Sequence, residues 1–209
     1  MLIVKMGLMK AGKSKDVIET YKPMKDIYYK AGIAIGIFVY KPYDERKWVD
    51  IESRAFDNKI ERVYNLANIK SASEVLEIFE FCHMVFIDEV QFAPLEHLNA
   101  IIEYAKTHDV FCYGLEKDYL SKPFESTWKL ITMGAYFLDD YNVIRLEADC
   151  DYCGDLAEHN IRLTDDENLF VVEKEIYKTV CDKCKIEIDE LRKPLENDEI
   201  EKEKSTWNQ

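Results

Sequence analysis

One eight-residue stretch near the start of the chain constrains the fold more than any other. Residues 7–14 read GLMKAGKS, which satisfies the phosphate-binding pattern G-x-x-x-x-G-K-[ST]. Glycines let the backbone wrap around phosphate oxygens, and consecutive N–H groups then bind the anion together with the start of a helix. The pattern needs a buried strand before it and a helix after it, and therefore predicts an α/β nucleotide-binding fold.

The residues of this loop are the candidate ATP ligands. Lys13 would reach the β- and γ-phosphates, and the hydroxyl of Ser14 would bind Mg²⁺. A chance match in a strand-to-helix turn is the alternative, but the apolar run MLIVKM precedes the loop and a helix-forming segment follows it. The full set of loop candidates is Gly7, Leu8, Met9, Lys10, Ala11, Gly12, Lys13 and Ser14.

A pair of carboxylates follows a second apolar run. Residues 84–88 read MVFID and predict a buried strand that ends at Asp88, with Glu89 next in the chain. Asp88 would join the Mg²⁺ shell, and Glu89 could accept the proton of a reacting hydroxyl as a general base. Two alternatives remain open, because the pair could cap the helix near Pro94 and Glu89 could orient water for ATP hydrolysis.

Strands and helices alternate along most of the chain, which predicts a mostly parallel sheet with helices on both faces. Pro23 is expected to disturb or end the first helix, and Ser73 is the expected N-cap of the next one. The polar residues 41–59 read as a long exposed loop. Strands are expected at residues 1–6, 33–40, 60–67, 84–88, 110–114 and 142–148, and helices from residue 13, at 71–83 and at 94–108.

Four of the six cysteines form two C-x-x-C pairs, Cys150/Cys153 and Cys181/Cys184. Two such hooks can close a tetrahedral S₄ shell around Zn²⁺ and leave no position open for water, so the pattern predicts a structural zinc. Local disulfides or idle thiols are the alternative. We expect a P-loop domain at 1–148, a small zinc-stapled β-rich domain at 149–186 with a hairpin at 168–180, and an acidic, mostly disordered tail at 187–209.

The formal net charge of −13 disfavours nucleic acid or an anionic membrane as the main partner. No apolar run approaches the roughly 20 residues that span a bilayer. The amino terminus lacks the pattern of a signal peptide. We therefore expect a cytoplasmic protein.

Taken together, these features resemble thymidine kinase of the zinc-containing, P-loop type. The resemblance runs from about residue 2 to residue 185 and has its motifs in the family's order: GLMKAGKS, KPYDER, SR, FIDEVQF, GLEKDYLSKPF, CDYCGDLAEHNIRL and EIYKTVCDKC. It implies a RecA-like α/β fold, a zinc-anchored lasso-like loop that closes over a nucleoside, and a homotetramer. The implied reaction, which supplies DNA precursors by salvage, transfers the γ-phosphate of ATP to the 5′-hydroxyl of thymidine with Mg²⁺. Feedback inhibition by thymidine triphosphate (dTTP) is implied as well.

The resemblance also gives roles to single residues. Glu89 matches the general base, and Arg54 matches a basic residue near the transferred phosphate. Ser14 and Asp88 match the Mg²⁺ positions, and Asp88 and Gln91 join the loop residues as ATP ligands. The positions implied to surround the nucleoside are Met9, Phe92, Leu115, Tyr119, Phe124, Asn160, Val171, Val172 and Tyr177, with Arg162 on the same arm as Asn160.

The chain departs from the family pattern at several positions. Lys10 stands where the family commonly has Phe, and Val172 and Glu173 replace a usual Gly-Gly pair in the lasso. The second departure leaves open a kinase of another deoxynucleoside, such as deoxyuridine. Further alternatives are a RecA-like ATPase or nucleotide sensor without a nucleoside substrate, and a structural zinc protein with a relic P-loop. The intact Lys13 and Glu89 argue against the relic.

Overall fold

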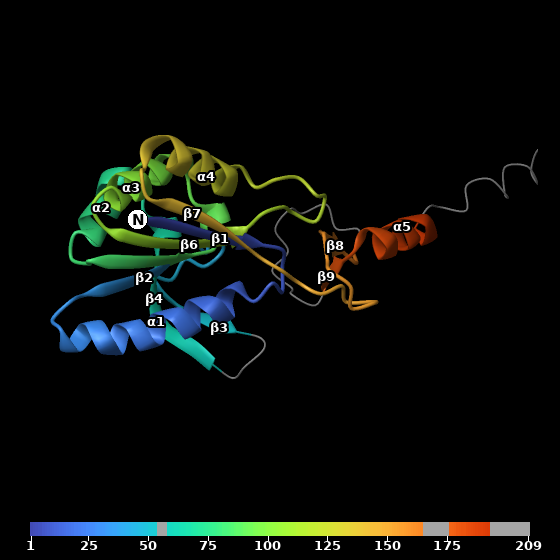
Figure 1. The fold of residues 1–209 in the computed structure, drawn as a ribbon, viewed down its shortest axis with the longest axis horizontal. Coiled ribbons are helices and arrows are strands. Elements are labelled where there is room, and N and C mark those ends of the chain that lie inside the picture. Colours follow the sequence, from blue (N-terminus) through green and yellow to red (C-terminus); the bar gives the residue numbers. More distant parts are fainter. Residues whose placement is uncertain (54–57, 165–175, 193–209) are drawn as a thin grey trace, which may run out of the picture.

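The larger part of the molecule is a seven-stranded sheet with the strand order β3-β4-β2-β5-β6-β1-β7 (Figure 1). The computed structural model describes residues 1–53, 58–164 and 176–192. All pairings in this sheet are parallel except β3 with β4, which confirms the predicted α/β class. Its strands are β1 (Leu2–Gly7), β2 (Ile35–Val39), β3 (Trp48–Ser53), β4 (Asn58–Asn65), β5 (Met84–Asp88), β6 (Asp109–Leu115) and β7 (Tyr141–Leu146).

Helices cover both faces of the sheet, and β5 shows how the two cores form. Its side chains alternate between the faces, so that Val85 and Ile87 join one core while Met84 and Phe86 join the other. The first core packs against α2 (Ala72–Phe79), α3 (Leu95–Ala105) and α4 (Glu125–Phe137), and the second packs against α1 (Lys13–Lys30). Short 3₁₀ helices follow β4 (η1, Leu66–Asn68) and β5 (η2, Val90–Phe92).

A smaller unit follows the sheet, and we call its described residues, 149–164 and 176–192, the cysteine module. It consists of the antiparallel strands β8 (His159–Arg162) and β9 (Tyr177–Val180) and the helix α5 (Asp182–Leu191). Figure 1 shows it beyond the end of β1, on the side of the phosphate loop. Its buried apolar cluster holds three of the four paired cysteines with Ile161 and Val180. So small a core needs a further staple.

Three local predictions are wrong. Helix α1 does not end at Pro23 but continues to Lys30, because the proline lies on the exposed side, where a helix curves convex toward solvent, while residues beyond it still pack on the core. The N-cap of α2 is Ser71, whose hydroxyl accepts from the Glu74 N–H at 3.3 Å, and Ser73 lies inside the helix. The expected loop at 41–59 contains β3, an antiparallel strand whose Val49 and Ile51 are buried.

Two helices differ from the sequence reading in other ways. Helix α4 was not predicted, because Gly134 and several β-branched residues weaken its helical propensity. Helix α5 runs to Leu191, so the first residues of the expected tail, 187–191, are helical. The rest of the expected tail and most of the expected hairpin at 168–180 lie outside the described residues. None of the helices in the described ranges has the length and apolar character needed to cross a membrane.

Candidate active site

The phosphate loop is the connection between β1 and α1, as predicted. A Cβ on Gly7 would lie 2.5 Å from the carbonyl oxygen of Leu146, so the parallel pairing of β1 with β7 leaves room for glycine alone. Gly12 has a φ of 79°, a left-handed conformation that glycine adopts without strain, and it is the N-cap of α1. The loop therefore ends at a helix N-terminus, where N–H groups and the helix dipole favour an anion.

The ammonium group of Lys13 lies inside this loop. Its Nζ donates to the carbonyl oxygens of Leu8 at 2.6 Å and Gly7 at 3.4 Å. Burial lowers the pKa of Lys13 to about 8, although the carboxylates of Glu89 and Asp88 oppose that shift. A buried cation whose charge is disfavoured in this way gains most from an anionic ligand such as a phosphate.

Asp88 ends β5 and Glu89 follows it, at the same edge of the sheet as the loop, because the carboxyl ends of parallel strands meet there. Asp88 is buried, and its pKa is raised to about 7 by burial first and then by the charge of Glu89, against the effect of Lys13. A cation at this carboxylate would favour its charged form and so lower the pKa of Asp88. Carboxylate and hydroxyl oxygens are the ligands that Mg²⁺ prefers, so Asp88 and Ser14 fit a magnesium site.

Glu89 has a left-handed backbone, with φ 57° and ψ 37°, and its N–H donates to Oδ1 of Asp88 at 2.9 Å. Gln91 then fixes its carboxylate. The Gln91 Nε2 donates to Oε2 of Glu89 at 2.5 Å, and the Gln91 Oε1 accepts from the Leu115 N–H at 3.0 Å. Gln91 is buried, so its side chain joins Glu89 to the end of β6. In this structure the amide that the sequence reading gave to ATP is directed to Glu89.

Aromatic rings gather next to Glu89. The ring of Phe92 lies edge-on to those of Phe124, at 5.9 Å between centroids, and Tyr43, at 5.7 Å. Burial, then the charge of Glu89 and then Tyr177 raise the pKa of Tyr43 to about 12. The structure thus brings together Phe92, Phe124 and Tyr177 as predicted. It adds Tyr43, which lies in the KPYDER motif and was missed as a site residue.

A second aromatic group lies between the sheet and the cysteine module. The rings of Tyr119 and Tyr177 are 6.3 Å apart. The guanidinium of Arg162 lies 4.0 Å from the centroid of the Tyr119 ring and donates to the Tyr119 hydroxyl at 2.9 Å. Asn160 is buried, and its amide accepts from the Met9 N–H at 2.9 Å and donates to the carbonyl of Lys117 at 3.0 Å. Asn160 therefore holds the loops that frame the site.

The four paired cysteines converge, with all four sulfur atoms within 4.8 Å of one another and no disulfide among them. The Sγ atoms of Cys153 and Cys181 are 3.6 Å apart. Four sulfurs about 2.3 Å from a tetrahedral zinc stand about 3.8 Å apart, so this donor set fits Zn²⁺. A second group, Glu158, His159 and Asp182, fits a metal ion less well, because the His159 Nε2 already lies 2.5 Å from Asp182.

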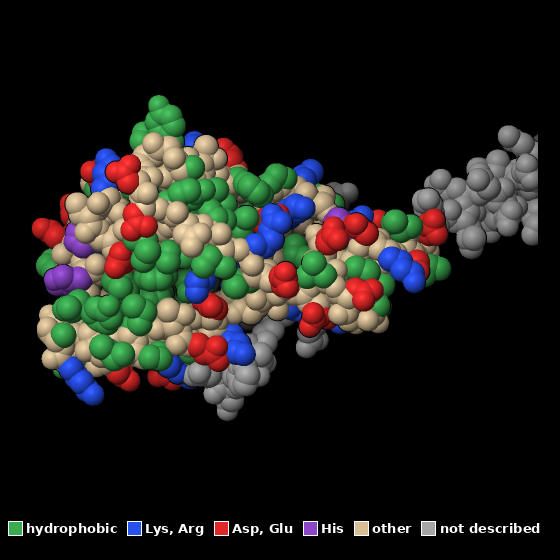
Figure 2. All heavy atoms as spheres, viewed as in Figure 1, with side chains coloured by type: hydrophobic (Ala, Val, Ile, Leu, Met, Phe, Trp, Pro, Cys, Tyr) green, Lys and Arg blue, Asp and Glu red, His purple; other side chains and the backbone are tan. Residues whose placement is uncertain are grey.

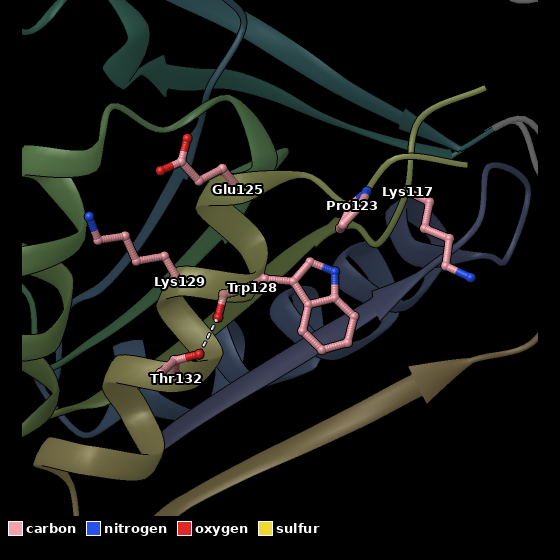
Figure 3. A pocket seen from close by; sticks show the side chains of 6 residues that line it. All are labelled: Lys117, Pro123, Glu125, Trp128, Lys129 and Thr132. Carbon is pink, nitrogen blue, oxygen red and sulfur yellow. Dashed lines mark hydrogen bonds between the residues drawn. The ribbon is translucent and has the colours of Figure 1, made fainter. Parts of the chain in front are cut away.

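Three predicted site residues, Arg54, Val171 and Val172, lie outside the described residues. A shallow hollow of about 630 Å³ lies beside α4 (Figure 3). It contains none of the predicted site residues. Its lining residues are Lys117, Pro123, Glu125, Trp128, Lys129 and Thr132.

The family model and the curated relatives agree on one family. The thymidine kinase family model matches residues 1–185. Thymidine kinase of Bacillus subtilis subsp. natto is 30% identical over 189 residues, which cover 84% of this chain and 91% of that protein. Those of Pseudothermotoga lettingae and enterobacteria phage T4 are 29% and 27% identical, covering 86% and 87% of this chain and 91% and 93% of theirs. Among solved structures, Candida albicans Pif1 helicase aligns with a TM-score of 0.39 at 12% identity, over 69% of this chain and 36% of that chain.

Proposed function

The chain belongs to the thymidine kinase family, and we propose that it phosphorylates thymidine by transferring the γ-phosphate of ATP to the 5′-hydroxyl. One observation carries this proposal: Glu89 and Asp88 lie beside Lys13 at a single sheet edge, close enough for both carboxylates to act on the pKa of the lysine. The candidate phosphate site and the candidate base therefore lie at the same edge of the sheet. Deoxynucleotide salvage for DNA synthesis is the role that follows.

ATP binds with its phosphates in the loop between β1 and α1. The loop amides and the N-terminus of α1 take the negative charge, and Lys13 exchanges its carbonyl contacts for phosphate oxygens. Ser14 and Asp88 would hold Mg²⁺, which supplies charge neutralisation at the phosphates. Arg54 is proposed as a further cation near the transferred phosphate.

Glu89 accepts the proton of the 5′-hydroxyl. It follows Asp88 in the chain and has a left-handed backbone, and we assign one carboxylate to the metal and the other to the substrate. The 2.5 Å hydrogen bond from Gln91 holds the carboxylate in one orientation. A fixed base aligns the nucleophile without reorganisation at the moment of transfer.

The thymine base occupies the aromatic group beside Glu89. Flat rings with few polar groups suit a pyrimidine, and Phe92, Phe124 and Tyr177 supply them together with Tyr43. Met9, Leu115, Tyr119, Asn160, Val171 and Val172 complete the proposed nucleoside site. Arg162 supports it by holding the Tyr119 ring.

Zinc at Cys150, Cys153, Cys181 and Cys184 has a structural role, because four thiolates close its shell. We also propose a cytoplasmic homotetramer inhibited by dTTP, and small molecules rather than nucleic acid or membrane as partners. Acidic and basic side chains are interspersed over the face in Figure 2, which agrees with the small-molecule proposal. Light scattering with and without dTTP tests the assembly.

The deciding experiment incubates the protein with Mg²⁺-ATP and a panel of thymidine, deoxyuridine, deoxycytidine and purine deoxynucleosides. Thymidine monophosphate should form fastest. Faster product from deoxyuridine would shift the substrate to that nucleoside, and ATP turnover independent of any nucleoside would identify an ATPase or sensor instead. The Glu89→Gln variant should lower kcat by about 10²–10⁴-fold with ATP affinity nearly unchanged. An unaltered kcat would remove Glu89 as the base.

A further inference from the structure

The cysteine module contacts the phosphate loop directly, through the loop residue that departs from the family pattern. The Lys10 Nζ lies 2.8 and 2.6 Å from the two carboxylate oxygens of Asp151. This pair is largely shielded, with the two side chains 28% and 22% exposed. The charge of Lys10 is thus paired with a carboxylate of the module.

Asp151 is fixed by both cysteine arms. It lies between Cys150 and Cys153 in the sequence, and its Oδ2 accepts from the N–H of Thr179 at 2.8 Å. Its own N–H donates to the Thr179 carbonyl at 2.8 Å, and Thr179 lies two residues before Cys181. The position of this carboxylate therefore depends on how the two C-x-x-C hooks are held together.

Two more contacts back the same loop. Asn160 of β8 accepts from the Met9 N–H at 2.9 Å, and Leu8 and Ala11 form an apolar cluster with Ala148 and Ala157. Each of the four residues between Gly7 and Gly12 therefore contacts the cysteine module or belongs to the apolar cluster that includes Ala148, the residue just before the module. Lys10 itself has a φ of 61°, a left-handed conformation that a lysine adopts at a cost, so the loop shape needs support from outside.

We propose that zinc at the four cysteines and ATP in the phosphate loop raise each other's affinity, because the cysteine module forms the outer wall of the loop. Lys10 and Asp151 are the positioning residues that transmit this effect. Metal fixes the hooks, the hooks fix Asp151, and Asp151 holds Lys10 in the conformation that the loop needs to receive phosphate. Thermodynamic linkage requires the effect to be equal in both directions. The inference rests on the proposed function in that it takes ATP as the ligand of the loop.

The test measures two equilibrium affinities on the full chain. The Kd for Mg²⁺-ATP is measured by calorimetry on zinc-loaded protein and, in parallel, after removal of zinc. The Kd for zinc is measured by competition with a chromophoric chelator, with and without saturating Mg²⁺-ATP. We expect both affinities to change by the same factor. In Lys10→Met this factor should shrink by up to about fivefold, the upper end of the range for one ion pair near the surface.

Matched variants separate this effect from a general loss of structure. Asp151→Asn, which keeps an acceptor for Thr179, should reduce the factor as Lys10→Met does, and the double variant should add little more. Lys10→Arg keeps the ion pair and should restore the factor. Lys106→Met removes a more exposed ion pair, with Glu103 on α3, outside the loop and the module, and should leave the factor unchanged.

The possible outcomes are distinct. If the wild-type chain binds ATP but its zinc affinity does not respond to ATP, the inference is wrong and the kinase proposal stands. If Lys10→Met and Asp151→Asn retain the full factor while folded, the coupling does not pass through this pair and the inference is again wrong. If the zinc-loaded chain binds no ATP, both the proposed function and this inference are wrong.

Discussion

Replacing Gln91 by methionine tests whether the orientation of Glu89 matters for catalysis. Methionine keeps the length of the side chain but removes both of its hydrogen bonds. The first is the 2.5 Å bond to Glu89, and the second is the 3.0 Å bond from the Leu115 N–H. The change therefore releases the proposed base and leaves a strand-end N–H without its acceptor.

The loss of the first hydrogen bond affects kcat, and the loss of the second affects the free energy of unfolding. A hydrogen bond to a charged group contributes about 1.5–3 kcal/mol, and if all of it serves to orient Glu89 in the transition state, kcat falls by about 10- to 150-fold. The stranded Leu115 N–H costs about 1–3 kcal/mol of the free energy of unfolding. The KM for ATP should remain unchanged, because Gln91 is directed toward Glu89 in this structure.

Steady-state kinetics with thymidine and urea unfolding measure these quantities. Thr127→Val is the matched control, because it removes the 2.9 Å hydrogen bond from the Thr127 hydroxyl to the Leu115 carbonyl without touching Glu89. It should lower stability and leave kcat intact. In a Glu89→Gln background, Gln91→Met should lower kcat no further. A full additional loss there, or an unchanged kcat in Gln91→Met alone, would refute the orienting role.

Three further changes follow from single contacts. His97 is fully buried, its Nδ1 is 3.3 Å from the Tyr40 hydroxyl, and burial lowers its pKa. The folded state thus favours the neutral imidazole, so below about pH 6.5 the free energy of unfolding of wild type should fall relative to that of His97→Phe, by up to ~1.4 kcal/mol per pH unit. Gly7→Ala, whose Cβ would meet the Leu146 carbonyl oxygen, should lower that free energy by about 1–3 kcal/mol or more and weaken ATP binding in calorimetry. Cys184→Ser should reduce zinc from one per chain to near zero by elemental analysis and lower the melting temperature; an unchanged zinc content would exclude the four-cysteine site.

Much of the fold could be predicted from local patterns, because continuous apolar runs identify buried parallel strands. The prediction of β5 at residues 84–88 is confirmed to the residue. Strand β3 was missed because an antiparallel edge strand buries only alternate residues, here Val49 and Ile51, among exposed charges. The N-cap of α2 could have been found, since S-x-x-E at Ser71–Glu74 is the pattern of a capping box.

The candidate site, like the fold, could be predicted from the sequence only where local motifs indicate it. Residues that belong to a local motif, such as Lys13 and Asp88, were predicted as site residues and lie at the same edge of the sheet. The resemblance implies ATP as the ligand of Gln91, and nothing local in the sequence indicates that its amide contacts Glu89 and the Leu115 N–H in the structure. Tyr43 was missed for a similar reason, as its proximity to Phe92 depends on the three-dimensional path of the chain after β2.

Lys10 shows why a departure from a family pattern cannot be interpreted at its own position. In a phosphate loop, an extra lysine suggests an extra phosphate contact. The structure instead pairs its ammonium group with Asp151, which lies far along the sequence between two cysteines. A change back to an apolar residue at position 10 alone would leave a partly buried carboxylate without its cation, which costs more than the ion pair itself contributes. Lys10 and Asp151 are therefore best treated as one feature that joins the nucleotide loop to the zinc module.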